Sequence, residues 1–264
     1  MLLEIDDLSV SFATGEGEVE AVKNVSLSLD RGEVLGIVGE SGSGKSSVAM
    51  SVVRLLPSPP ASYPSGRILL DGEDTLSLPA WRLRSIRGKR VGVVFQDPMG
   101  SLSPLRRIAD QLVETVLLHE DVSRRAALDL ALEWLGRVGI RDPERAAKAY
   151  PHELSGGMQQ RVMIAMGMML GPDLVIADEP TTALDVTVQA QILRLMKSLR
   201  SASSGVMLIS HDLGVISQMA TKIAVMKEGR LVEFSSSAEG FFANPRDPYS
   251  RKLIAEARKM EMKT

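Results

Sequence analysis

The chain has 264 residues, of which 44% are hydrophobic and 24% are charged, and it contains no cysteine. This composition is ordinary for a globular protein, and the lack of cysteine excludes disulfides and thiolate metal sites within these residues. The formal net charge of −2 gives no indication of nucleic-acid binding through bulk charge.

The sequence gives no sign of a membrane-crossing segment. Acidic residues within Met1–Asp7 stand where a signal peptide would carry bases. The longest apolar stretch, residues 162–177, is interrupted by Gly171, Pro172 and Asp173. We therefore expect that the protein is not itself a membrane channel.

The N-terminal part is predicted to be rich in strands. Alternating patterns or short apolar runs predict strands over residues 3–12, 25–29, 33–38, 66–70 and 90–95. Residues 16–20 predict a hairpin loop, and residues 57–64 predict a connector rich in proline and serine. Between them, a helix is expected from Lys45 to about Leu56, ending before a proline.

The composition changes after Gln96. Apolar residues recur at helical spacing between residues 108 and 170, which predicts an inserted helical subdomain. Strand signals return over residues 174–177, 205–210 and 222–226, with helices between them, so the order is that of a β-α-β fold. The predicted domains are a core that contains the strands (1–96 and 171–236), a helical subdomain (97–170) and a C-terminal tail (237–264).

A basic stretch, residues 82–90, lies between two of the predicted strands. Charged runs of this kind are most often a solvated face of the protein. Nucleic-acid binding is the second and weaker interpretation.

One motif dominates the sequence. Gly39-Glu40-Ser41-Gly42-Ser43-Gly44-Lys45-Ser46, followed by Ser47, fits the phosphate-binding pattern G-x-x-x-x-G-K-[ST] and lies between a predicted strand and a predicted helix. Its glycines permit close backbone approach, so that N–H groups form a nest for an anion. Lys45 would supply charge to the β- and γ-phosphates, and the Ser46 hydroxyl would ligate Mg²⁺.

Two carboxylates follow the apolar strand over residues 174–177. A hard cation beside phosphates prefers oxygen ligands, so Asp178 is the natural metal ligand and Glu179 the residue that orients or deprotonates water. The alternative is an ordinary acidic strand end. The nearby phosphate-binding motif favours the functional interpretation.

A second glycine-containing turn, Leu154-Ser155-Gly156-Gly157, precedes an apolar helix. Ser155 is a good N-cap, and the glycines permit close approach of a backbone. Taken alone, these properties favour a simple capped helix start.

Together these motifs resemble the nucleotide-binding subunit of an ATP-binding cassette (ABC) transporter over nearly the whole chain. The specific features are Leu154-Ser155-Gly156-Gly157 followed by Gln160-Arg161, and their place about twenty residues before Asp178-Glu179. The resemblance implies an α/β P-loop NTPase fold: a RecA-like mixed sheet core with an antiparallel β subdomain and an inserted helical subdomain.

The resemblance also implies residue roles. ATP and Mg²⁺ are the implied cofactors, with Gln96 joining Ser46 and Asp178 at the metal, and with His211 orienting the γ-phosphate. Phe12 lies where an aromatic ring stacks on adenine. The signature residues would contact the nucleotide bound to a second cassette; they are Ser155, Gly156, Gly157 and Gln159. Asp185 would lie in the loop at the contact between the two cassettes. For His211 the alternative is a buried structural histidine.

Within the family, several stretches resemble the oligopeptide, dipeptide and nickel importer group. They are residues 95–102, 149–153, 181–189 and 243–249. The chain departs from the expected pattern in three places: Phe12 replaces a tyrosine, Gly100 and Ser103 replace threonine and asparagine, and no cysteine cluster follows. Stacking at Phe12 survives this change, and no iron–sulfur site is expected.

The implied partners are a second ABC cassette (a sibling subunit, or a copy in a homodimer), two membrane permease subunits and, indirectly, a solute-binding protein. The implied activity is ATP hydrolysis driving peptide uptake, at the cytoplasmic face of the inner membrane as a peripheral subunit, without nucleic acid. Alternatives are nickel or metal-chelate uptake, lipid or lipoprotein export, a regulatory cassette without turnover, and a soluble ABC ATPase acting on DNA or ribosomes.

Overall fold

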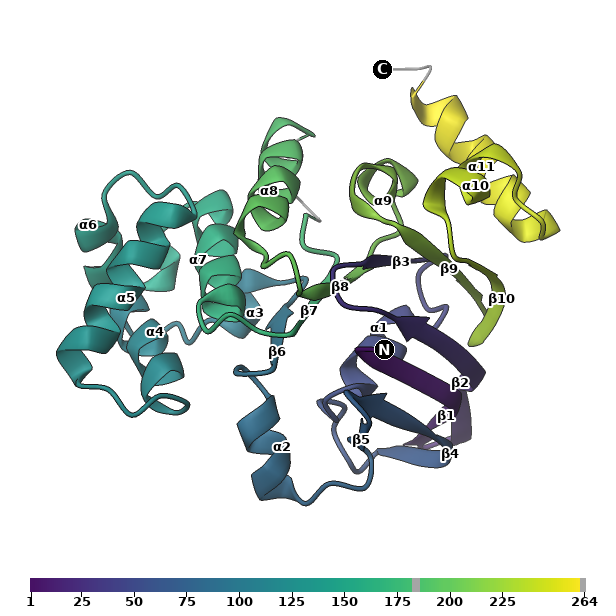
Figure 1. Cartoon of the computed structure of the whole chain (residues 1–264), viewed down its shortest axis with the longest axis horizontal. Coiled ribbons are helices and arrows are strands. Elements are labelled where there is room, and N and C mark those ends of the chain that lie inside the picture. Colours follow the sequence, from purple (N-terminus) through teal and green to yellow (C-terminus); the bar gives the residue numbers. More distant parts are fainter. Residues whose placement is uncertain (182–185, 262–264) are drawn as a thin grey trace. The chain divides into compact units, whose positions relative to one another are not determined.

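The structure, a computed structural model, describes residues 1–181 and 186–261. Within it the chain forms two compact units. We call Met1–Leu83 with Ala202–Thr264 the strand-rich unit and Arg84–Ser201 the helix-rich unit (Figure 1). The chain passes from the first unit to the second within helix α2 (Ala80–Ile86).

The strand-rich unit contains an antiparallel sheet of order β2-β1-β4-β5. Its strands are β1 (Leu3–Thr14), β2 (Gly17–Leu29), β4 (Ala61–Leu70) and β5 (Glu73–Asp74). Leu3, Ile5, Leu8 and Val10 of β1 are almost fully buried, because one face of this sheet covers the core. A register shift between Ile5 and Leu8 moves the alternation by one residue.

The same unit holds the strand that leads into the phosphate-binding motif. β3 (Val34–Val38) pairs in parallel with β8 (Gly205–Ile209) and with β9 (Lys222–Lys227), and β10 (Arg230–Ser235) closes an antiparallel hairpin on β9. β3 is buried along its whole length, as its continuous apolar sequence predicts. The helices of this unit are α1 (Lys45–Ser51), α9 (Leu213–Met219), α10 (Ala238–Ala243) and α11 (Pro248–Glu261).

Three predicted segments differ from the structure. The loop expected over residues 16–20 belongs mostly to β2, because a short turn held by the Thr14 hydroxyl and the Gly17 carbonyl (2.6 Å) leaves the acidic residues paired with β1. The connector expected over residues 57–64 ends early, since β4 begins at Ala61, which pairs with Phe12. The helix after the phosphate motif ends at Ser51 instead of near Leu56, because the chain turns there and Arg54 takes a positive φ of 50°, which an α-helix does not contain.

The helix-rich unit contains the parallel strand pair β6 (Val91–Val94) and β7 (Leu174–Asp178). Its helices are α3 (Pro98–Ser101), α4 (Ile108–Leu117), α5 (Arg124–Arg137), α6 (Pro143–Lys148), the 3₁₀ turn η1 (Pro151–Glu153), α7 (Gly156–Met168) and α8 (Val186–Leu199). The predicted apolar face of α5 is buried at Ala127, Ala131 and Leu135, whereas Arg124 on its other face is exposed.

These observations confirm the predicted α/β fold, with antiparallel and parallel strands and an inserted set of helices. The predicted domain boundaries (1–96 and 171–236, 97–170, 237–264) were drawn by function rather than by packing, and they stay a prediction. In the tail, the structure adds the helices α10 and α11, which the sequence pattern did not resolve.

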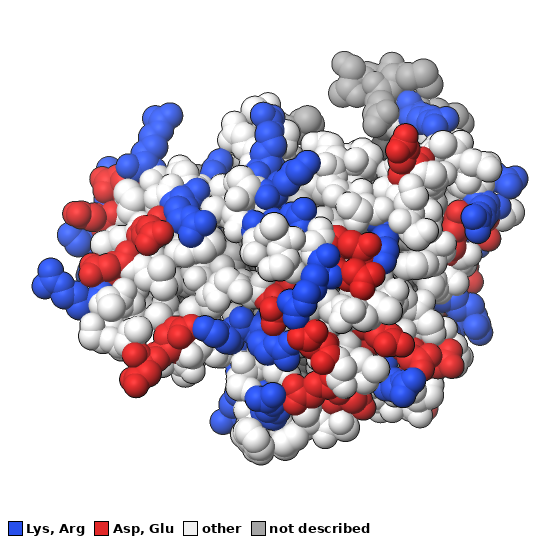
Figure 2. All heavy atoms as spheres, in the orientation of Figure 1, with Lys and Arg blue, Asp and Glu red and all other residues white. Residues whose placement is uncertain are grey.

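Several surface charges form ion pairs. In the basic stretch, Arg82 bonds Glu73 and Arg90 bonds Asp173, each at 3.0 Å. Basic and acidic side chains are interspersed on the face drawn in Figure 2. Paired charges of both signs favour a solvated surface over a nucleic-acid footprint. Among the described residues, no helix combines the length and the apolar character that crossing a bilayer requires.

Candidate nucleotide-binding site

The phosphate loop (Gly39–Ser46) joins β3 to α1 in the strand-rich unit. Gly39 and Gly44 have positive φ angles of 151° and 96°. A Cβ at Gly39 would lie 2.1 Å from the Met226 carbonyl oxygen, and one at Gly44 would lie 2.4 Å from that of Ala21. Both positions therefore need glycine for conformation and for space.

Lys45 lies inside this loop. Its side chain is 5% exposed, and its Nζ donates to the carbonyl oxygens of Gly39 and Glu40, both at 2.8 Å, with Ser43 Oγ at 3.4 Å. A buried ammonium needs such acceptors, because desolvation of a charge is costly. The loop thus holds a fixed positive charge within a glycine-lined cradle, which suits a phosphate group.

The other predicted loop residues line the mouth of this cradle. Ser41, Gly42 and Ser46 are exposed, whereas Ser43 is buried. Ser47 is the third residue of α1, and its carbonyl oxygen accepts a hydrogen bond from the Ser51 hydroxyl at 2.6 Å within that helix. The loop is therefore continuous with α1 and open toward solvent at its exposed residues.

In the helix-rich unit, β7 delivers the two predicted carboxylates. Asp178 is the last residue of the strand and is 7% exposed. Glu179 follows with a φ of 45°, which is a strained conformation for a residue other than glycine. Gln96 Nε2 donates to Glu179 Oε2 at 3.2 Å. The structure therefore brings together two of the three residues predicted to be catalytic.

The signature turn (Leu154–Gly157) begins α7, and the Ser155 hydroxyl accepts from the Met158 N–H at 3.4 Å. A Cβ on Gly156 would meet no atom within 4 Å, and one on Gly157 would only touch Val188 at 3.7 Å. Ser155 is exposed. The turn thus presents an open, small-residue surface.

Gln159 takes a different position from the other signature residues. Its side chain is 4% exposed, and its amide donates to the carbonyl oxygens of Pro151 (2.8 Å) and Leu154 (3.1 Å). These hydrogen bonds from a buried amide stabilise the conformation of the turn. In the described structure, Gln159 supports the signature turn rather than facing solvent.

His211, Phe12 and Asp185 are the remaining predicted site residues. His211 is exposed, directly before Asp212, whose carboxylate caps α9 by accepting from Gly214 N–H at 2.7 Å. Exposure removes the alternative of a buried structural histidine. Phe12 is half-buried on β1. Asp185 lies outside the described residues.

The predicted site residues thus form two sets, one in each unit. The strand-rich unit holds Phe12, the phosphate loop and His211. The helix-rich unit holds Gln96, Asp178, Glu179 and the signature turn.

The sequence did not predict the structural role of two further residues, Gln160 and Tyr249. Gln160 donates from its buried amide to the Pro180 carbonyl at 2.6 Å, which ties α7 to the segment after Glu179. In the tail, the Tyr249 hydroxyl accepts from the Glu40 N–H at 3.1 Å. Both residues stood in stretches that resembled the family, but no local pattern indicates their contacts.

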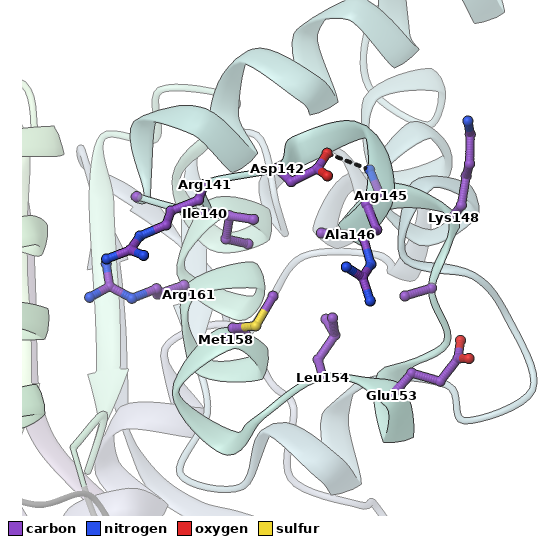
Figure 3. A pocket seen from close by; sticks show the side chains of 12 residues that line it. Ile140, Arg141, Asp142, Arg145, Ala146, Lys148, Glu153, Leu154, Met158 and Arg161 are labelled. Atoms are coloured by element: carbon purple, nitrogen blue, oxygen red, sulfur yellow. Dashed lines mark hydrogen bonds between the residues drawn. The ribbon is translucent and has the colours of Figure 1, made fainter.

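The helix-rich unit also has a pocket of about 700 Å³ beside the signature turn. Figure 3 shows the Met158 and Leu154 side chains on its floor, with the Arg145 guanidinium directed into it. Arg141, Lys148 and Arg161 add further positive charge to its lining. Asp142 and Glu153 also line the pocket, so it combines an apolar floor with a rim in which basic side chains outnumber acidic ones.

Comparison with known proteins decides the family. Residues 22–182 match the family model described as ABC transporter. The chain belongs to the ABC transporter family. The predicted resemblance is therefore confirmed, and with it the assignment as a nucleotide-binding ATPase cassette.

The similar proteins extend this result to almost the whole chain. It is 47% identical to the oligopeptide transport ATP-binding protein OppD of Bacillus subtilis (strain 168), over 98% of this chain and 73% of that protein. It is 51% identical to the peptidoglycan transport ATP-binding protein YejF of Agrobacterium fabrum, over 98% of this chain but only 48% of YejF.

A solved structure supports the same fold. The dimeric post-hydrolysis state of the ATP-binding cassette MJ0796, bound to ADP and Pi, superposes with a TM-score of 0.79 at 29% identity. The match covers 89% of this chain and 99% of that one. The ABC cassette fold is therefore confirmed.

Proposed function

We propose that this chain is the ATP-hydrolysing subunit of a peptide importer and acts as one of two paired cassettes. The observation that carries the nucleotide site is the buried Lys45 ammonium, held inside a loop that only glycine at Gly39 and Gly44 permits. A fixed positive charge inside a glycine-rich loop of this pattern suits the phosphates of ATP.

Each site residue has a chemical role in this proposal. Lys45 balances the charge of the β- and γ-phosphates. Glu179, held by Gln96, orients the attacking water and accepts its proton. His211 orients the γ-phosphate, and Phe12 stacks on adenine.

The residues present also suit Mg²⁺. Ser46 of the strand-rich unit offers a hydroxyl oxygen, and Gln96 and Asp178 of the helix-rich unit offer an amide oxygen and a buried carboxylate. These are oxygen donors of the kind that this hard cation prefers, and they would hold it. When bound, the cation supplies charge neutralisation at the β- and γ-phosphates.

We further propose that a second cassette completes the site. In this chain a side chain at either signature glycine would meet no close contact, so the fold itself does not require glycine there. Ser155, Gly156 and Gly157 would therefore meet the γ-phosphate held by the other cassette, with Asp185 beside them and Gln159 supporting the turn. The dimeric cassette MJ0796 is consistent with this arrangement. We favour a sibling subunit over a second copy.

The membrane subunits would contact the loop after Gln96. Met99 and Leu105 in this loop are 62% and 86% exposed, so the loop offers two large apolar side chains to a membrane subunit. The pocket beside the signature turn, with its basic rim, suits an acidic and apolar segment of such a subunit (Figure 3). This contact would hold the chain at the cytoplasmic face of the inner membrane as a peripheral subunit.

We propose a peptide as the transported solute because the similar proteins, OppD above all, are described as peptide transport proteins. The transport path and the solute-binding protein would be separate chains. Nickel or metal-chelate uptake remains the second candidate, since the tail and loop stretches resemble both groups.

The test is ATP turnover by the purified chain, alone and assembled with a second cassette and permeases. We expect turnover mainly in the assembly. Exchange of residues 97–105 for the loop of an unrelated cassette should uncouple transport and spare hydrolysis. Full activity of the chain alone would contradict the shared site, and transport that survives the loop exchange would contradict the proposed membrane contact.

A further inference from the structure

The C-terminal tail is fastened to the strand-rich unit by a buried carboxylate. Glu233, on β10, is 8% exposed. Its two oxygens accept from the N–H groups of Arg246 (2.9 Å) and Asp247 (3.0 Å). Hydrogen bonds between charged and neutral groups are among the stronger ones in proteins. Glu233 therefore fixes the backbone immediately before α11.

The fixed segment in turn positions Tyr249. Asp247 Oδ1 accepts from the Tyr249 N–H at 2.7 Å, so the first turn of α11 has a capped start. The Tyr249 side chain is 8% exposed, and its ring lies 5.2 Å from the ammonium of Lys227. The ring is therefore held from both the backbone and the side-chain ends.

Tyr249 reaches the phosphate loop. Together with Lys227 and Glu228 it walls a small hollow of about 80 Å³, whose other side is formed by residues 40–43 of the loop. Its hydroxyl accepts from the Glu40 N–H at 3.1 Å. Burial raises the pKa of Tyr249, so the hydroxyl stays protonated at neutral pH.

This contact acts on a single peptide group. The N–H of Glu40 and the carbonyl of Gly39 belong to the same trans peptide and point in opposite directions. Tyr249 holds the N–H end, and the carbonyl end accepts from Lys45 Nζ at 2.8 Å. Rotation of this peptide would move both partners, so Tyr249 fixes the orientation that holds the Lys45 ammonium.

We propose that Tyr249 is a positioning residue for nucleotide binding, through which the C-terminal tail sets the affinity of the phosphate loop. This role lies outside the segment matched by the family model, which ends at residue 182. It rests on the proposed function, because it presumes that the loop binds ATP. Loss of the hydroxyl leaves the fold intact and makes the loop less preorganised.

The test compares Tyr249→Phe with Tyr63→Phe, which removes a hydroxyl from β4 in the same unit. Dissociation constants for a fluorescent ADP analogue and for ATP are measured on the full chain, and KM and kcat on the assembled transporter. We expect Tyr249→Phe to raise both dissociation constants and KM about three- to tenfold, with kcat unchanged. Tyr63→Phe should match the wild type. Glu233→Gln, which loosens the anchor, should shift binding in the same direction.

An unchanged nucleotide affinity in Tyr249→Phe, beside a wild type that binds and hydrolyses ATP, overturns this inference alone. A fall in kcat with unchanged KM also overturns it, because it would point to chemistry rather than loop position. A wild type that binds no nucleotide overturns the proposed function and this inference together.

Discussion

The phosphate loop and the signature turn are both glycine-containing turns that lead into a helix, but they use glycine for different reasons. In the phosphate loop, a Cβ at Gly39 would collide with backbone at 2.1 Å, and the φ of 151° is unfavourable for any other residue. In the signature turn, a Cβ on Gly156 would meet nothing within 4 Å.

This difference separates glycine required by the fold from glycine required by something outside it. The phosphate loop needs its glycines to fold around Lys45 in its own chain. The signature turn would fold equally well with alanine. Its open surface leaves room for another molecule to approach closely, which is the role of the second cassette in our proposal.

The largest expected effect comes from Gly39→Ala. The added methyl group has no room, so the loop must rearrange, and we expect a loss of at least about 2 kcal/mol in unfolding free energy. Nucleotide binding should be lost as well. Chemical denaturation and ATP titration measure both effects.

The matched control is Gly156→Ala, which we expect to stay within about 0.5 kcal/mol of the wild type in stability and to bind nucleotide normally as an isolated chain. A large destabilisation by Gly156→Ala would remove the distinction between the two turns.

Glu179→Gln tests the chemistry without changing either turn. We expect ATP turnover of the assembly to fall by about 10²–10⁴-fold, because the amide cannot accept the proton of water. Nucleotide affinity should be retained, as the Gln96 contact does not involve Lys45. A variant with near wild-type turnover would show that another residue is the base.

Ser155→Ala sharpens the comparison within the signature turn. Loss of the N-cap hydrogen bond to Met158 should cost about 1 kcal/mol of stability. Turnover of the assembly should also fall, because in our proposal the hydroxyl contacts the second cassette. Ser123→Ala, which removes the N-cap of α5, is the control: it should cost similar stability and leave turnover unchanged.

The smallest effect concerns the tail anchor and pH. Burial raises the pKa of Glu233, but the neighbouring Ser250 hydroxyl and the Arg246 and Asp247 amides lower it by more, so the net shift is downward. A carboxylate whose pKa is lower in the folded state stabilises the fold at pH values above its unfolded-state pKa of 4.5. This contribution is lost as the pH falls through the folded-state pKa.

We therefore expect Glu233→Gln to lower the unfolding midpoint at neutral pH. The difference from the wild type should shrink as the pH is lowered below about 4.5, and thermal melts across this range measure it. A difference that is independent of pH would show that the carboxylate charge is not what anchors the tail.

The sequence predicted the strand-loop-helix context of the phosphate loop because apolar runs and glycine spacing are local signals. It did not predict that residues 17–20 continue β2, since their pairing with β1 depends on a distant partner strand. The same reason applies to Tyr249: its contact with Glu40 joins residues 209 positions apart, and no periodicity records it.

The measurement that tests the central claim most directly is ATP-dependent pairing of cassettes. Chains carrying Glu179→Gln, with or without the bulky Gly156→Trp change, are mixed with the second cassette. The molar mass of the mixture is measured by light scattering in ATP and in ADP. We predict that the Glu179→Gln chain forms a stable pair in ATP but not in ADP. Adding Gly156→Trp should abolish this pair while the chain stays folded. Pairing that is unaffected by Gly156→Trp would contradict the claim that the signature turn faces a partner.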